Sequence, residues 1–154
     1  MLFRSASVTI NDTSRAPAPP TPTYAVLPSA AAINEGLALT TTVSTTNVAT
    51  GTVLYWALSG TGITAADFSA GALTGSGTVG ATGQFSFSHT LANDLLTEGV
   101  ETLQIKLYSD AARTVQVGTT ASVTINDPSR APAPPPPTYA VLPSAAAINE
   151  GLAL

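Results

Sequence analysis

The sequence contains no cysteine, a single histidine and few charged residues among its 154 residues. Without cysteine, the chain has neither a disulfide framework nor a cysteine-based metal or redox site. Charged side chains make up 9% of the residues, whereas soluble proteins usually contain about 25%. The surface must therefore consist mainly of hydroxyl groups and small side chains. Stability must come from packing, backbone hydrogen bonds or a bound ion.

The residue types that most often carry catalysis are scarce as well. An active site needs a nucleophile with a base, a carboxylate pair in a pocket, or a metal with an open coordination position. His89 follows Phe85 and Phe87 at a spacing of two residues, which is typical of a strand residue packed against its neighbours. We therefore expect that the chain is not an enzyme.

Cations and long apolar runs are also few. Five Lys and Arg against nine Asp and Glu give a net charge of −4, so no basic stripe is available for phosphate groups. The apolar stretch 24–27 ends at Pro28, far short of the ~20 residues of a membrane-crossing helix. We expect no nucleic-acid partner and no membrane span.

Proline is absent from one block and concentrated on both sides of it. All twelve prolines lie outside residues 29–127. We therefore expect one complete folded unit over residues 24–127, between proline-rich linkers at 13–23 and 128–138. Such a composition favours the extended polyproline II conformation, and the linkers should be semi-rigid spacers.

The two ends of the chain carry almost the same sequence. Residues 6–39 return as residues 121–154, and only Thr13/Pro128 and Thr21/Pro136 differ among the 34 aligned positions. A near-identical repeat at a fixed spacing is typical of a tandem array. Residues 1–12 then correspond to the last strand of a preceding repeat, and residues 139–154 to the first strands of the next.

Within the proline-free block, apolar and polar residues alternate with a period of two, which predicts strands and no helix. The inward-facing residues are expected to include Leu54, Trp56, Leu58, Phe85, Phe87, Leu103, Ile105, Leu107, Val123 and Ile125. Glycine-rich joints separate seven expected strands: 24–34 (interrupted at Pro28), 37–45, 52–59, 72–78, 83–91, 101–108 and 114–126. Seven short strands in about 100 residues predict an all-β fold, an immunoglobulin-like two-sheet sandwich.

The acidic residues of this unit gather in or beside its turns. They are Glu35, Asp67, Asp94, Glu98, Glu101 and Asp127, with Asp110 as the outlier. Alternate turns of a sandwich meet at one end, where carboxylates can surround a cation. Asn-Asp and Glu-Gly pairs also form ordinary turns through side-chain bonds to the backbone. Both interpretations stay open from the residues alone.

Several motifs together resemble the Calx-β repeat family. They are Ile33-Asn34-Glu35-Gly36, Val53 to Gly60, Ala65-Ala66-Asp67-Phe68, Asn93 to Leu103, and Val123-Thr124-Ile125-Asn126-Asp127. The resemblance covers roughly residues 24–127 in the family's order. It implies a seven-stranded sandwich of the kind found in sodium–calcium exchangers, in integrin-linked proteins and in long tandem arrays of large bacterial surface and adhesion proteins. It also implies an extracellular or cell-surface location.

The resemblance further implies a calcium site. Carried over position by position, the ligands would be Glu35, Asp67, Asp94, Glu98, Glu101 and Asp127. The sequence departs from the family pattern where the acidic clusters shrink to Asn93-Asp94 and Asn126-Asp127. Because charge is lost at both places, fewer or weaker calcium ions are expected.

Three functions fit these observations. The first is a structural repeat of a long extracellular fibre, stalk or adhesin, stiffened by calcium, whose partners are neighbouring repeats. The second is a subunit of a head-to-tail filament, in which identical subunits exchange strands because residues 139–154 have the sequence of 24–39. The third is a module that binds a glycan or surface ligand, for which the candidate aromatic platform is Tyr24, Tyr55, Trp56 and Tyr108.

Overall fold

The computed structural model describes residues 7–11, 16–93, 99–128 and 135–140. Within these residues the chain forms nine strands and one short 3-10 helix, η1 (Ala65–Asp67). The strands are β1 (Thr23–Pro28), β2 (Ala32–Asn34), β3 (Ala38–Thr46), β4 (Val53–Ser59), β5 (Phe68–Ala70), β6 (Thr74–Thr78), β7 (Gln84–Leu91), β8 (Glu101–Tyr108) and β9 (Gln116–Asn126). No helix in this described part of the chain is long and apolar enough to cross a membrane.

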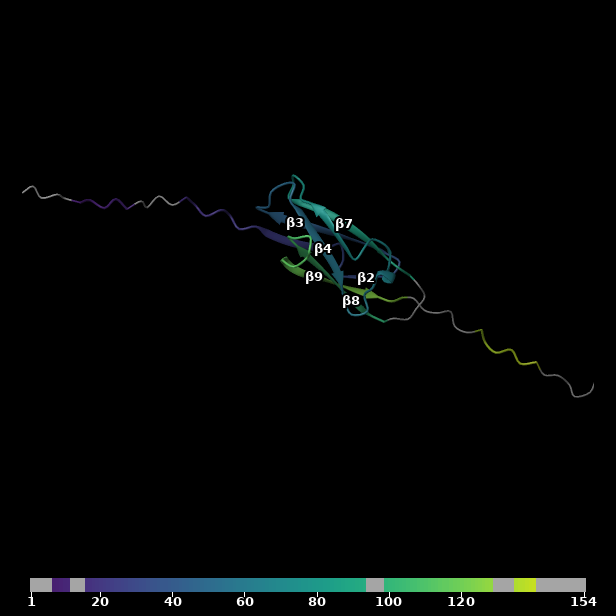
Figure 1. Ribbon diagram of the computed structural model, residues 1–154. Helices are drawn as coiled ribbons and strands as arrows, with labels where there is room; N and C mark the ends of the chain where they lie inside the picture. The colour runs from purple at the N-terminus through teal and green to yellow at the C-terminus, as the bar shows by residue number, and fades with distance from the viewer. Residues whose placement is uncertain (1–6, 12–15, 94–98, 129–134, 141–154) are drawn as a thin grey trace, which may run out of the picture.

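The strands form two sheets, which lie over each other in Figure 1. The four-stranded sheet has the order β1-β3-β7-β5, and the five-stranded sheet has the order β2-β9-β8-β4-β6. All pairs are antiparallel except β2 with β9, which run parallel. The expected all-β fold of two sheets is therefore confirmed.

The strand count differs from the seven that the sequence predicts. Residues 24–34 were expected to form one interrupted strand, but β1 pairs with β3 in one sheet and β2 pairs with β9 in the other. The change of sheet follows Pro28, which has no N–H to continue a ladder. The short strand β5 adds the ninth, held at the sheet edge by the buried Phe68. The sequence does not predict β5, because its three residues are too few to show an alternation of apolar and polar side chains.

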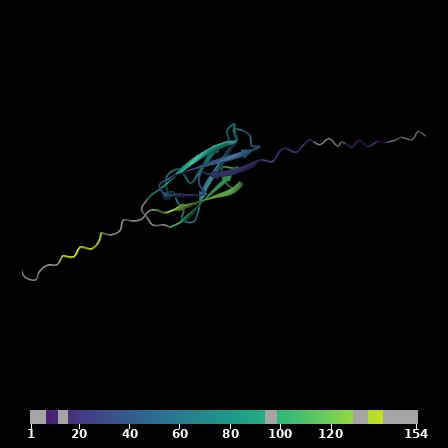
Figure 2. The same cartoon turned by 180° about the vertical axis from the view of Figure 1, so that it is seen from behind.

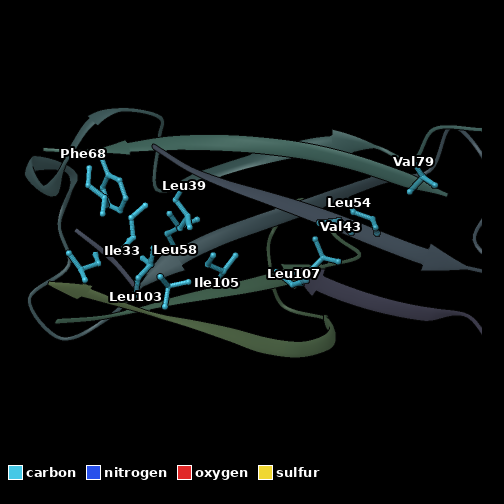
Figure 3. Packing of buried hydrophobic residues seen from close by; sticks show 14 residues of the cluster. Ile33, Leu39, Val43, Leu54, Leu58, Phe68, Val79, Leu103, Ile105 and Leu107 are labelled. Carbon is cyan, nitrogen blue, oxygen red and sulfur yellow. The ribbon is translucent and has the colours of Figure 1, made fainter. Parts of the chain in front are cut away.

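The core lies between the two sheets, as Figure 3 shows. Alternate residues of β3, β4, β8 and β9 point inward. Seven of the predicted inward residues are buried: Leu54, Leu58, Leu103, Ile105, Leu107, Val123 and Ile125. Trp56, Phe85 and Phe87 are partly buried and pack against this cluster. The inward-facing pattern predicted from the sequence is thus confirmed.

His89 is a packed strand residue, as predicted. It is 3% exposed, and its Nε2 lies 2.7 Å from the carbonyl oxygen of Ala72. Its ring meets Phe68 and Phe87 edge to face, with centroid distances of 5.5 and 5.7 Å.

Aromatic rings fill the space beside the edge strand β6. The rings of Trp56 on β4 and Phe87 on β7 are stacked, with centroids 4.0 Å apart and an interplanar angle of 2°. Gly75 of β6 faces the ring of Trp56, and Gly77 faces the neighbouring ring of Phe85. A Cβ at Gly75 would overlap the ring of Trp56, and one at Gly77 would overlap Phe85. The two glycines therefore make room for the aromatic side chains.

The outer face of the four-stranded sheet is covered by hydroxyl and amide side chains. Three pairs join β3 to β7: Thr40 with Ser88 at 2.9 Å, Thr42 with Ser86 at 3.0 Å, and Gln84 Nε2 with Ser44 Oγ at 3.4 Å. The members of each pair are cross-strand partners in register. Cross-strand hydrogen bonds of this kind support a sheet without using charge.

The two ends of the strand system lie at opposite poles of the sandwich. The start of β1 is paired with the end of β3 (Thr23 with Thr46), whereas the end of β9 is paired with the end of β2 (Asn126 with Asn34). Residues 16–22 before β1 and residues 127–128 after β9 accordingly leave the sandwich at opposite ends in Figure 1 and in the reverse view of Figure 2. The chain thus runs through the folded part from pole to pole.

The glycine that accommodates Trp56 gives a stability prediction. Gly75→Ala should lower the free energy of unfolding by about 1–3 kcal/mol, because the added methyl group would displace the Trp56 ring. The matched control is Ser76→Ala, the next residue of the same edge strand, whose side chain is exposed. Urea unfolding of both variants measures the difference. Equal free energies of unfolding for the two variants would show that β6 can shift to accommodate the methyl group without loss of stability.

Candidate functional site: the acidic pole

Four of the six predicted calcium ligands lie at one pole, which we call the acidic pole. Glu35 follows β2, Asp67 ends η1, Glu101 begins β8 and Asp127 follows β9. The pairings of Asn34 with Asn126 and of Glu101 with Ile125 bring three of these positions to the same sheet end. Asp94 and Glu98 lie outside the described residues.

Backbone hydrogen bonds tie the turns of the acidic pole together. Gly36 turns the chain with a φ of 78°, a conformation that glycine adopts readily. Its N–H donates to the carbonyl of Ala92 at 3.3 Å, and the N–H of Ala92 donates to the carbonyl of Asp67 at 2.8 Å. The N–H of Glu35 donates to the carbonyl of Asn126 at 3.2 Å. The turns that bear Glu35, Asp67 and Asp127 are thus held as one assembly.

The carboxylates of Asp67 and Asp127 accept hydrogen bonds from these turns. The Asp67 carboxylate accepts a hydrogen bond from the N–H of Thr64, and the Thr64 hydroxyl accepts one from the N–H of Ala66. Both hydrogen bonds of a capping box are thus present at the start of η1. Asp127 Oδ2 accepts from the N–H of Gly99 at 3.1 Å. These contacts agree with the turn-forming interpretation of the acidic residues.

Glu35 and Glu101 also have interaction partners of their own. Across residues 7–11, 16–93, 99–128 and 135–140, no three His, Cys, Asp or Glu side chains form a group that could hold a metal ion. The four described carboxylates of the acidic pole are thus not gathered into such a group.

The opposite pole carries a second charged element, the loop between β8 and β9. The Asp110 carboxylate accepts from the N–H of Val115 at 2.8 Å, from the N–H of Thr114 at 3.0 Å and from the Thr114 hydroxyl at 2.8 Å. The hydrogen bond from Val115, followed by those from Thr114, holds the pKa of Asp110 below its ordinary value of 3.8, although partial desolvation opposes this. Asp110 therefore closes the loop in its ionised form.

Arg113 fastens the same loop to the sheet. Its Nε donates to the carbonyl of Trp56 at 2.9 Å, and another guanidinium nitrogen donates to the carbonyl of Gly75 at 3.3 Å. The guanidinium also lies over the ring of Tyr55, 5.9 Å from its centroid. No role was predicted for Arg113, and Asp110 was the outlier among the acidic residues. The spacing of Asp110 and Thr114 was a usable turn signal, whereas the role of Arg113 depends on contacts distant in sequence.

The four aromatic residues of the predicted glycan platform do not share one face. Tyr24 and Trp56 pack against the core. Tyr55 and Tyr108 are cross-strand partners that alternate with inward residues of β4 and β8, and so lie on the outer face of the five-stranded sheet. At most the pair Tyr55 and Tyr108 is available for a ligand there.

No protein-family model matches this chain, and no curated protein matches it. A solved structure that it resembles is that of the Pseudomonas fluorescens alkylpurine DNA glycosylase AlkC bound to DNA containing an abasic site analog. The TM-score is 0.37 and the sequence identity 12%, over 68% of this chain and 30% of that chain. The chain thus spans less than one third of the matched protein.

The matched protein is an enzyme, and the expectation that this chain is not an enzyme goes further than its residues allow. The expectation relied on the counts of histidine and cysteine, and such counts leave acid–base chemistry by carboxylates and hydroxyl groups open. We therefore withdraw it. A similarity this weak does not indicate an enzymatic activity for the chain either.

The lowered pKa of Asp110 predicts a pH-dependent contribution to stability. Because the folded-state pKa lies below the unfolded value, the contribution is present above the unfolded pKa and is lost as the pH falls through the folded pKa. Asp110→Asn should therefore lower the melting temperature at pH 6, and the difference from the parent chain should shrink as the pH falls below the ordinary carboxyl pKa of 3.8. Thermal unfolding of both proteins from pH 2 to pH 7 measures this. A difference that does not change with pH would assign the effect to loop geometry and not to charge.

Proposed function

We propose that this chain is a spacer unit of a long extracellular or cell-surface fibre, stalk or adhesin, in which folded units alternate with proline-rich linkers. The observation that carries the proposal is the path of the chain, which passes through the sandwich from one pole to the other. Units connected at opposite poles add their lengths along one axis. Units connected at the same pole would fold back on each other.

The finer fold within this proposal is a seven-stranded immunoglobulin-like sandwich of the Calx-β kind. Counting β1 and β2 as one strand that changes sheet, and β5 as a short addition at an edge, leaves seven main strands. The support for the family is the set of sequence motifs, together with the two-sheet arrangement.

The length of one repeat follows from its two parts. The 11 residues of β9 span roughly 37 Å at about 3.4 Å per residue. The linker from 127 to 137, with 11 residues before the second copy of β1 begins at Thr138, spans roughly 34 Å in the polyproline II conformation. Each repeat should therefore advance the fibre by about 70 Å.

A second candidate function, a head-to-tail filament built by strand exchange, is favoured by one contrast. Val8 and Ile10 are 84% and 89% exposed, whereas Val123 and Ile125, in the same sequence context, are 0% and 3% exposed. In addition, β1 and β2 each lie at the edge of a sheet, and their sequence recurs in residues 138–149. An identical segment from another copy would fit the same positions.

Small-angle X-ray scattering separates the two functions. A two-unit polypeptide, with a second copy of 23–126 after residue 137, should be monomeric and show unit centres about 70 Å apart. Replacing the linker prolines by glycine and serine should shorten this distance, because such a linker of 11 residues averages only about 18 Å. Compact particles with the prolines intact would contradict the spacer, and a mass that grows with concentration would favour strand exchange.

Calcium is the further part of the proposal that the acidic pole allows. With a dissociation constant of about 10⁻⁴–10⁻³ M, 5 mM calcium should raise the free energy of unfolding by about 1–2 kcal/mol relative to chelator. The double variant Asp94→Asn, Glu98→Gln should abolish the rise, and Asp110→Asn at the opposite pole should keep it. Thermal unfolding measures all three. No rise in the parent chain would leave the carboxylates with a turn-forming role alone.

A further inference from the structure

The strands at the two ends of the folded unit are held side by side. β2 runs parallel to β9, with Ile33 opposite Ile125, and both side chains are buried in the core. Just before it, β1 pairs antiparallel with β3 over six residues, with Val26 buried opposite Val43. We call β1 and β2, with their pairing to β3 and β9, the terminal clamp.

Tension along a fibre would reach this clamp from opposite directions. The chain before β1 leaves at one pole and the chain after β9 at the other. A pull on both ends therefore drives β2 and β9 past each other along their own length. The same pull draws β1 along β3. Hydrogen bonds between strands run across the strand direction, so this sliding strains all of them together and does not open them one after another.

The contacts of the terminal clamp are distributed along its length. At the junction of β1 and β2, the N–H of Ser29 donates to the carbonyl of Thr40 at 2.8 Å, and the N–H of Thr124 donates to the carbonyl of Ala31 at 2.9 Å. At the acidic pole, the N–H of Glu35 donates to the carbonyl of Asn126 at 3.2 Å. The side chains of Asn126 and Asn34 are joined by a bond of 3.1 Å. Sliding of β2 along β9 would strain the backbone bonds of this set together.

We propose that the terminal clamp makes this unit a tension-bearing element, which resists unfolding when it is pulled from end to end. The inference rests on the proposed spacer function, because only a unit within a fibre would be loaded at these two points. It extends that function from holding a distance to transmitting force.

Single-molecule force spectroscopy on the full chain tests the clamp by changing the direction of pull. The chain contains no cysteine, so one introduced cysteine gives a unique attachment point. End-to-end pulling uses tags at the two termini. The comparison uses the N-terminal tag and Ala49→Cys, an exposed residue just beyond β3. This second geometry opens β1 from β3 at the Thr23–Thr46 pair and breaks one pair at a time.

The end-to-end unfolding force should exceed the opening force by about a factor of two or more at the same loading rate, because many bonds must break at once. Equal forces in the two geometries would overturn the proposal. Thermal unfolding of the Ala49→Cys chain should match the parent, which shows that the cysteine itself changes nothing.

A substitution within the clamp gives an independent test. Glu35 precedes Gly36 in a turn closed by the N–H of Leu37, and proline is accepted at this position of such a turn. Glu35→Pro removes the N–H that donates to Asn126 and should lower the end-to-end force without changing the opening force. Ser76→Ala on β6, an exposed position outside the terminal clamp, should change neither force. If Glu35→Pro does not fold, Asn126→Ala, which removes the bond to Asn34, serves in its place, with the same expectation.

Different experimental results would contradict the terminal clamp and the spacer function. A weak end-to-end force with unit centres still about 70 Å apart would overturn the clamp and leave the spacer in place. Compact two-unit particles would overturn the spacer, whatever the force.

Discussion

The parallel pairing of β2 with β9 is the constraint on which the rest of this structure depends. It requires that the first part of the chain cross from one sheet to the other after Pro28, and it fixes the end of β9 beside the end of β2. As a result, the chain arrives at one pole and departs from the other. A purely antiparallel arrangement of the first and last strands would return the chain to the pole from which it came. In the fibre that we propose, the three residues of β2 would thus decide how neighbouring units are arranged in space.

Much of the fold was predictable because burial follows a period of two. The stripes Leu103, Ile105, Leu107 and Val123, Ile125 mark inward faces without reference to any partner, and all five residues are buried. The change of sheet within residues 24–34 was not predictable in the same way. Pro28 shows that a ladder must stop there, but only the pairing partner tells which sheet takes up Ile33.

The candidate site was less predictable than the fold. Turn residues can be found from sequence, and Glu35, Asp67, Glu101 and Asp127 do lie at strand ends of one pole. The hydrogen bonds that their carboxylates accept depend on backbone geometry, which sequence spacing does not give. Asp67 closes a capping box, and Asp127 reaches the N–H of Gly99, 28 residues away. Arg113 shows the same limit, since its guanidinium binds carbonyls of Trp56 and Gly75 from another part of the chain.

The hydroxyl pairs across β3 and β7 have a consequence for the medium in which such a unit can work. Dissolved salt screens interactions between exposed charges over about 10 Å at 0.1 M and about 3 Å at 1 M. Thr40–Ser88 and Thr42–Ser86 hold the outer face of their sheet without ions, so salt has little there to weaken. We expect these hydrogen bonds on the sheet surface to persist at low and at high salt concentration alike.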